Sequence, residues 1–564
     1  MSIAGAATAR RVPSRSGRRG RTLAGPLLAV LIAFGAWTLV PLVTLLGHDG
    51  TYNGAYGIDV ADLMQYMAFI RDSGQHLLIS NRFDVVPDPH LFLDPVFAIS
   101  GLLWRLGASI QLSLLVWVPV AAGALAAAFT AYCRRLLGTD TAVAAGVLMA
   151  LLYLSPALAL AHWLGGGPTL QFGTQVVGLE MFAGAYAWGG GPALALAAMP
   201  VFLLSVEKLL EPSRRARGRS GRWYGGWAAA SGLLASWLHP WQGITLLVIL
   251  FGLAAWGRFG RRYLTLAGPA AATLAPLVYF EVLSHTHSSW MAAAHPNGYA
   301  HFGWWLLAAL APLILTLPGL RRSRLDVAER ILWLWPVAAF AVYLALDRTW
   351  FYHAFAGLSL PFAVLAVRSW RRLTRPGWLT APVLALVLVP GLVWTVQQLI
   401  DTEGQHFFAP GEARALAFLD RVGPPGPVLA APVPLGQAVP AFTGRQSYVG
   451  HYYWTPEYSL RAARVDALLD GRLDRTAALA VIRASRAVFL LSDCRPGRVD
   501  LDPLLGPALS ARWRFGCATV YEVSAGIRQA HSIAASPVVA IGLVRNPAAA
   551  RWRETAAVAS DSGL

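Results

Sequence analysis

The chain has 564 residues, of which 56% are hydrophobic and only 13% are charged. Soluble globular proteins carry about 25% charged residues, so this composition excludes a soluble protein and indicates a polytopic membrane protein. The net charge of +17 comes from 46 Lys and Arg against 29 Asp and Glu. These basic residues lie in short runs between apolar segments, a pattern typical of membrane topology and not of a nucleic-acid partner.

The first 22 residues form a basic tail with six Arg, and an apolar run from Leu23 to Leu46 follows. A secretory signal would have a shorter apolar core and a small-residue cleavage site. We therefore expect a retained first span with a cytoplasmic N-terminus, in a multi-pass protein of the plasma membrane.

Segments of about 20 apolar residues can cross a bilayer, and shorter ones can do so inside a bundle. About 11 such segments follow along the chain, at residues 23–46, 110–133, 142–162, 191–210, 225–238, 244–257, 264–283, 303–320, 331–346, 354–367 and 379–400. The segments 225–238 and 244–257 are short and flank His239, so one bent helix pair is an alternative there.

Alternate connections between these segments are basic, as the positive-inside rule requires of the cytoplasmic side. The basic connections hold Arg134-Arg135, residues 214–219, Arg258 with Arg261-Arg262, residues 321–324, and Arg368 with Arg371-Arg372. The remaining connections then face outward: residues 47–109, 164–190, 239–243, 284–302, 347–353 and everything after Ile400.

The character of the chain changes after Ile400, where a Gly- and Pro-rich turn at 423–427 precedes strand and helix patterns. We predict a small extracytoplasmic α/β domain over residues 401–524, with strands at 428–431, 488–492 and 518–523 and helices at 458–469 and 476–484. Residues 525–564 are expected to form a flexible tail, in which 538–544 could add a strand.

Three cysteines are present, and Cys133 at the end of a span is expected to be a small buried apolar residue. Cys494 and Cys517 both lie in the outer domain, in a compartment that permits oxidation. We predict a disulfide between them, with two free thiols as the alternative.

The first outward connection concentrates acids in a chain that has few of them: Asp59, Asp62, Asp72, Asp84, Asp88 and Asp94. Carboxylates gathered beside a bilayer point to a functional site. The same connection holds a run of short motifs, which are Asp62, Ser73-Gly74, Asn81-Arg82-Phe83, Asp94-Pro95 and Leu106-Gly107.

This layout resembles the polyprenyl-phosphate-sugar-dependent glycosyltransferases of the GT-C superfamily, in particular the bacterial protein-mannosyltransferase and aminoarabinose-transferase group. The resemblance implies an α-helical polytopic fold over residues 23–400, with helices of the first outer loop along the membrane and an outer C-terminal domain. It also implies transfer of a sugar from a polyprenyl-phosphate donor to a glycan, lipid or protein acceptor. The sequence departs from the common pattern at Leu63, where a second acid is frequent, and at Asp94-Pro95, where Lys-Pro-Pro is frequent.

Such a transfer needs a general base for the acceptor hydroxyl, and one carboxylate suffices for an inverting reaction because the leaving phosphate is already an anion. Asp62 is our first candidate and Asp59 the second, and in a helix both share a face with Gln65. The alternative is structural: Asp59 would cap a helix that starts at Val60, and Asp62 would interact with its dipole.

Four later residues are candidates for substrate contacts. Glu180 is the only charge in its outward segment, so it is either a second acid of the site or a partly solvated loop residue. Arg348 could bind the donor phosphate, or else pair with Asp347 or anchor a lipid headgroup. His239 and His353 could line the cavity, bind phosphate or complete a divalent-metal site with a carboxylate; the alternative for each is an interfacial anchor.

Two other classes of function compete with the enzyme. A transporter or flippase should carry ionisable residues at the membrane midplane, whereas the acids here gather in outer connections. A non-catalytic scaffold for envelope assembly would work through its outer domain, where residues 440–458 are rich in aromatic side chains that could stack on a sugar or pack against the bundle.

Overall fold

A computed structural model describes residues 25–46, 48–210, 219–257, 260–294, 303–320, 326–346, 349–373 and 377–528. The predicted basic tail, Arg348 and the predicted strand at 538–544 lie outside these residues.

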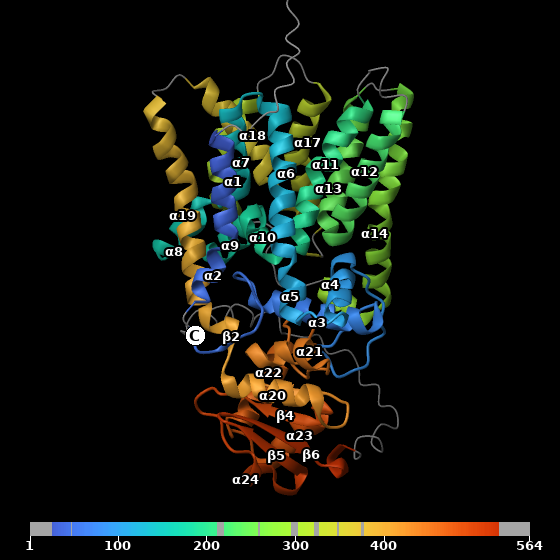
Figure 1. Cartoon of the computed structure of the whole chain (residues 1–564), viewed down its shortest axis with the longest axis vertical. Helices are drawn as coiled ribbons and strands as arrows, with labels where there is room; N and C mark the ends of the chain where they lie inside the picture. The colour runs from blue at the N-terminus through green and yellow to red at the C-terminus, as the bar shows by residue number, and fades with distance from the viewer. Residues whose placement is uncertain are drawn as a thin grey trace, which may run out of the picture.

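The membrane part is a bundle of helices that lie side by side (Figure 1), and every predicted apolar segment falls on one or two of them. The helices are α1 (Gly25–Thr38), α2 (Val40–Thr44), α5 (Ile110–Leu115), α6 (Trp117–Leu137), α7 (Asp140–Leu152), α8 (Pro156–Trp163), α11 (Gly191–Leu210), α12 (Arg219–Leu238), α13 (Pro240–Trp256), α14 (Ala267–Thr286), α16 (Trp304–Leu310), α17 (Val327–Ala345), α18 (Ser359–Arg372) and α19 (Thr380–Asp401).

Among the described residues, five helical stretches are long and apolar enough to cross a membrane: 110–137, 191–210, 262–286, 327–345 and 377–401. The pair α7 and α8, bent by 44°, could supply a sixth, and three more apolar helices are shorter. The protein is thus a multi-helix membrane protein. The number of spans, expected to be about 11, stays a prediction.

Two of the arginines that were predicted to lie on the cytoplasmic side form ion pairs with glutamates of other helices. Arg135 at the end of α6 donates to Glu207 of α11 at 2.7 Å, and Arg368 of α18 donates to both oxygens of Glu329 at 2.7 and 2.8 Å. Figure 1 places this end of α6 away from the C-terminal strands. The grouping agrees with a common cytoplasmic side, although the orientation itself stays a prediction.

Residues 48–109, which were predicted to be the first outer loop and keep that name here, contain two long helices, α3 (Val60–His76) and α4 (Pro95–Arg105). Both lie between the bundle and the C-terminal strands (Figure 1). They cross at two glycines: a Cβ on Gly101 would come within 2.5 Å of the Gly74 nitrogen. The Ser73-Gly74 motif therefore permits close packing of α3 on α4.

The C-terminal unit, residues 407–528, holds a four-stranded sheet in the order β3-β4-β6-β5, with β3 parallel to β4 and the other pairs antiparallel. Its strands are β3 (Val428–Ala430), β4 (Phe489–Ser492), β5 (Leu509–Phe515) and β6 (Ala518–Val523), and its longer helices are α20 (Pro410–Arg421), α21 (Gln437–Thr443), α22 (Tyr458–Leu469) and α23 (Arg475–Ser485). Helix α22 and strand β6 have the predicted bounds. The predicted disulfide between Cys494 and Cys517 is confirmed.

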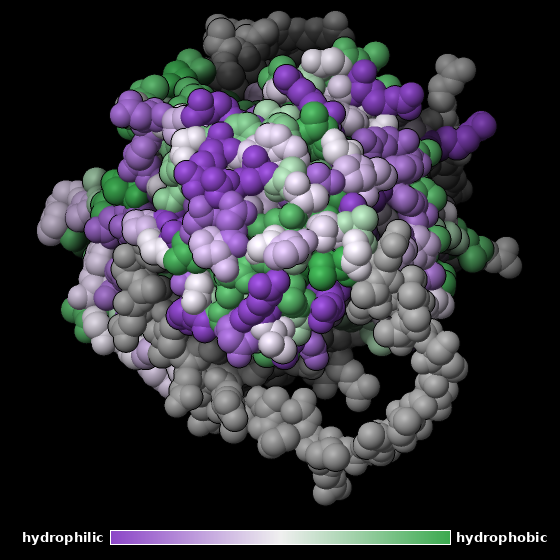
Figure 2. All heavy atoms as spheres, turned by 90° about the horizontal axis from the view of Figure 1, so that it is seen from below, coloured by the Kyte–Doolittle hydropathy of each residue, from purple (hydrophilic) through white to green (hydrophobic). Residues whose placement is uncertain are grey.

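The C-terminal unit is fastened to the first outer loop. Strand β1 (Thr51–Tyr52) pairs with β2 (Phe407–Phe408), and the two regions share one hydrophobic core. The Asn81-Arg82-Phe83 motif contributes to this docking, because the Asn81 amide donates to the Trp454 carbonyl at 2.9 Å and the backbone carbonyl of Arg82 accepts from the Ser447 N–H. The face seen from the far end of this unit is mostly hydrophilic (Figure 2).

Candidate functional site

Asp59 and Asp62 lie at the start of α3, on the side of the first outer loop that faces the bundle. Asp59 occupies the N-cap position of α3, but its side chain makes no capping hydrogen bond. The alternative that Asp59 serves to cap this helix is therefore not supported. Gly57, which precedes them, packs against Trp188 with a φ of 115°, a conformation that favours glycine. The local backbone thus brings both carboxylates against the bundle.

The Asp59 carboxyl reaches water, yet it sits in a recess surrounded by protein atoms. Burial in this recess, together with the nearby carboxylates of Asp62 and Glu180, raises the pKa of Asp59 to about 7. The three acids come from two distant parts of the sequence. Asp62 and Glu180 thus lie near enough to Asp59 to raise its pKa.

The Asp62 side chain is 43% exposed. Its Oδ1 lies 3.1 Å from Nε2 of His451, whose ring is buried. The backbone N–H of Tyr453 donates to Nδ1 of His451 at 3.2 Å. In a neutral ring this leaves the proton on Nε2, so His451 donates to Asp62. His451 therefore links the C-terminal unit to the site.

Glu180 lies near the end of α9 (Pro168–Met181), and its residue is only 9% exposed. The Tyr186 hydroxyl, from α10 (Ala183–Gly189), donates to one carboxylate oxygen. The other oxygen lies 2.8 Å from Nδ1 of His353. The Gly-rich segment 164–190 is largely helical, because residues 168–188 between the two glycine clusters are mostly apolar and Pro168 starts α9.

His239 and His353 are brought together by the HPWQG segment. His239 is 6% exposed and precedes Pro240, the first residue of α13, and its ring lies 5.0 Å from that of His353. The Gln242 amide donates to the carbonyls of His353 and Ala356 at 3.0 and 2.9 Å. Gln242 thus holds the turn that carries His353.

Two groups of side chains in the described part of the chain could hold a metal ion: Glu180 with His239 and His353, and Asp72 with His76 and His90. In the second group Arg82 already donates to Asp72 at 2.7 and 3.1 Å, and Ser80 donates to the other oxygen. A guanidinium supplies the positive charge there, so the second group is explained without a metal.

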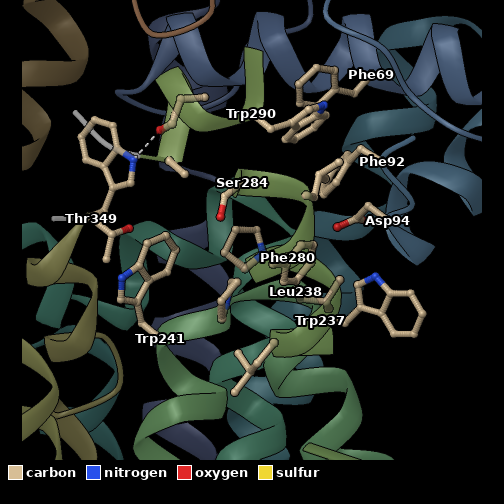
Figure 3. A pocket seen from close by; sticks show the side chains of 18 of the residues that line it. Phe69, Phe92, Asp94, Trp237, Leu238, Trp241, Phe280, Ser284, Trp290 and Thr349 are labelled. Carbon is tan, nitrogen blue, oxygen red and sulfur yellow. Dashed lines mark hydrogen bonds between the residues drawn. The ribbon is translucent and has the colours of Figure 1, made fainter. Parts of the chain in front are cut away.

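A pocket of about 620 Å³ adjoins the acids, and many of the side chains that line it are aromatic (Figure 3). Gln65 and Tyr66 of α3 form one wall, and the other walls include parts of α4, α12, α13, α14, α15 (Ser288–Ala294) and the C-terminal unit. The labelled lining residues are Phe69, Phe92, Asp94, Trp237, Leu238, Trp241, Phe280, Ser284, Trp290 and Thr349 (Figure 3). The size lies within the range of about 300–1,000 Å³ common for ligand pockets.

Asp94 is the buried acid of this pocket. One of its oxygens accepts from the N–H groups of Val96 and Phe97 at 2.8 and 3.0 Å, which caps α4. Burial raises the pKa of Asp94 to about 6, against the lowering effect of these two bonds. The Asp94-Pro95 motif therefore starts a helix and also places a carboxyl in the pocket wall.

The structure brings together Asp59, Asp62, Glu180, His239 and His353 and puts Gln65 in the adjoining pocket; Arg348 lies outside the described residues. Their roles stay predictions. His451 was not among the predicted site residues. The one sequence signal for it is a polar ring within the aromatic segment 448–454, a signal equally typical of packing.

No family model and no curated protein sequence matches the chain. Among solved structures, an oligosaccharyltransferase of Archaeoglobus fulgidus in the apo form is similar, with a TM-score of 0.51 and 12% identity over 83% of this chain and 69% of that chain. The archaeal oligosaccharyltransferase AglB from the same organism, in complex with an inhibitory peptide and a dolichol-phosphate, gives a TM-score of 0.50 with the same identity and coverage. At this identity the likeness concerns the fold. The chain therefore shares the fold of these oligosaccharyltransferase structures, which agrees with the polytopic helical fold that the resemblance implies.

Proposed function

We propose that this protein is an integral membrane glycosyltransferase that takes a sugar from a polyprenyl-phosphate donor and passes it to a hydroxyl of an acceptor on the extracytoplasmic face. The observation that carries the proposal is the convergence of Asp59, Asp62 and Glu180 beside a large aromatic pocket. A dolichol-phosphate bound by a protein of the same fold supports a donor of this class.

In the proposed reaction Asp62 takes the proton of the acceptor hydroxyl. The hydroxyl oxygen attacks the anomeric carbon of the sugar, and the bond from that carbon to the phosphate oxygen breaks. The electron pair leaves with the polyprenyl phosphate, so the anomeric configuration is inverted. Asp62 suits this role because it combines an accessible carboxylate with a fixed orientation set by His451. Asp59, whose pKa of about 7 is that of a proton acceptor poised near neutrality, is the second candidate.

The donor would place its prenyl chain in the aromatic pocket and its phosphate toward the acids. A carboxylate-rich site needs positive charge to hold a phosphate. Arg348 is proposed for this contact, since it is the one basic residue in the predicted outward connection 347–353. Glu180, His239, His353 and Gln65 are proposed to line the site for the sugar and the acceptor.

The proposal is tested with purified protein in vesicles that contain a labelled polyprenyl-phosphate sugar and an extract of envelope acceptors. Wild-type protein should transfer label, and Asp62→Asn should lower the rate by about 10²- to 10⁴-fold, the range for loss of a general base. Asp49→Asn is the control, because Asp49 is an exposed acid of the same loop. Full transfer by Asp62→Asn would refute the assignment.

The same vesicles separate the two rival functions. A flippase would move labelled lipid between leaflets without forming a glycosylated product. A scaffold would do neither, and its cellular function would be lost on deletion of residues 410–564 and kept in Asp62→Asn.

A further inference from the structure

Glu180, His239 and His353 come from three separate parts of the chain, and their ligand atoms form a compact group. One carboxylate oxygen and one ring nitrogen from each histidine all lie within 4.8 Å of one another. Ligand atoms around a tetrahedral zinc ion are about 3.3–3.5 Å apart, because the bonds to zinc are about 2.0–2.2 Å long. The distances between the ligand atoms of this group are therefore close to those that a single bound ion requires.

The orientation of the side chains also favours an ion. Nδ1 of His353 lies 2.8 Å from Glu180, yet the two atoms lack the alignment of a hydrogen bond. Nδ1 of His239 is buried and has no hydrogen-bond partner among the described residues. Leaving such a buried atom unpaired costs free energy unless something binds it.

We infer that Glu180, His239 and His353 together bind one divalent transition-metal ion of the zinc class. Two imidazoles and one carboxylate are the protein ligands of several catalytic zinc sites, which keep a further position for substrate or water. Imidazole nitrogens disfavour Mg²⁺ and Ca²⁺, which prefer oxygen ligands.

Two neighbours of this group act as supports that keep the ligands in place. Tyr186 donates to the second oxygen of Glu180, and Gln242 fixes the turn of His353 through two carbonyls. Hydrogen bonds of this kind orient metal ligands in known sites. When bound, the ion would supply positive charge for the leaving phosphate; this role rests on the proposed function, whereas the binding of metal does not.

The test is the zinc content of the purified full-length protein, measured by mass spectrometry, and titration of metal-depleted protein with Zn²⁺ alone. We expect one tightly bound ion per chain. Glu180→Gln and His239→Ala should each weaken Zn²⁺ binding by more than about 100-fold, beyond the range of about 10- to 100-fold seen when a supporting residue is lost. Tyr186→Phe should fall in that lower range.

The matched control is His90→Ala in the Asp72 group, which should leave the zinc content unchanged. A His239→Cys variant guards against simple misfolding, because a thiolate also binds zinc and gives a charge-transfer absorption band with Co²⁺. Absence of stoichiometric zinc, or its loss in His90→Ala alone, would overturn the inference. Zinc bound without any sugar transfer would leave the inference standing and contradict the proposed function instead.

Discussion

Nε2 of His451 lies 3.1 Å from Oδ1 of Asp62, although 389 positions separate the two residues in the chain. His451 is almost fully buried, and the Tyr453 N–H fixes its tautomer. The C-terminal unit therefore reaches into the site through one side chain, and the carboxylate proposed as the base has its orientation set from outside the membrane bundle.

His451→Ala should lower kcat by about 10²-fold with little change in KM, because a carboxylate free to rotate is misplaced by about an ångström. His451→Gln, which keeps an N–H donor, should recover part of the loss. Steady-state transfer kinetics check both variants.

Arg71→Gln is the control for undocking of the C-terminal unit. Arg71 donates to the Phe442 carbonyl at 2.9 Å and pairs with Asp420 across the same interface without touching Asp62. Equal losses of kcat in Arg71→Gln and His451→Ala would show that His451 acts by docking the C-terminal unit and not by orienting Asp62.

The raised pKa of Asp59 predicts how stability depends on pH. The unfolded chain loses this proton near pH 3.8, whereas the folded chain keeps it until about pH 7. The folded state therefore binds more protons across this window, and the contribution of Asp59 to the free energy of unfolding falls as pH rises from about 4 to about 7.

Asp59→Asn should remove this contribution, so the variant should lose less stability than wild type between about pH 4 and about pH 7, as measured by thermal unfolding in detergent. Asp49→Asn serves as the comparison. Parallel pH profiles for wild type and Asp59→Asn would show that Asp59 ionises normally in the fold.

Narrowing the aromatic pocket should impair the use of long-chain donors. Ser284 lines the pocket, and its replacement by Trp would fill part of the volume (Figure 3). We expect Ser284→Trp to raise KM for a long polyprenyl donor by about tenfold, equivalent to roughly 1.4 kcal/mol of binding, and to affect a short-tailed donor less.

Thr286→Trp is the matched control, since Thr286 is exposed on the same helix and does not line the pocket. If KM is unchanged in Ser284→Trp, or rises equally in Thr286→Trp, the pocket does not bind the prenyl chain of the donor.

Features set by local pattern were predictable from the sequence. Helix α3 begins at Val60 as expected, and α22 and β6 have the expected bounds, because apolar periodicity and flanking breakers are local signals. Strand β5 was missed although its burial alternates along Leu509–Phe515, because three polar or charged side chains and small Ala511 weaken the hydrophobic signal. Helices α20 and α21 were missed as well.

The arrangement of the site could be predicted less well from the sequence, because it depends on contacts between distant segments. The acids of the first outer loop could be named from their rarity and position. That Glu180 would meet His239 and His353, and that His451 would meet Asp62, follows from packing among helices and strands that no local pattern encodes.

The most direct test of the central claim is a cryo-EM map of the full-length protein with a bound polyprenyl phosphate. We predict density for the prenyl chain in the aromatic pocket between Tyr66 and Trp290, with the phosphate beside Asp62 and the group formed by Glu180, His239 and His353. A phosphate bound elsewhere, with Asp62 in contact with bulk solvent only, would contradict the account.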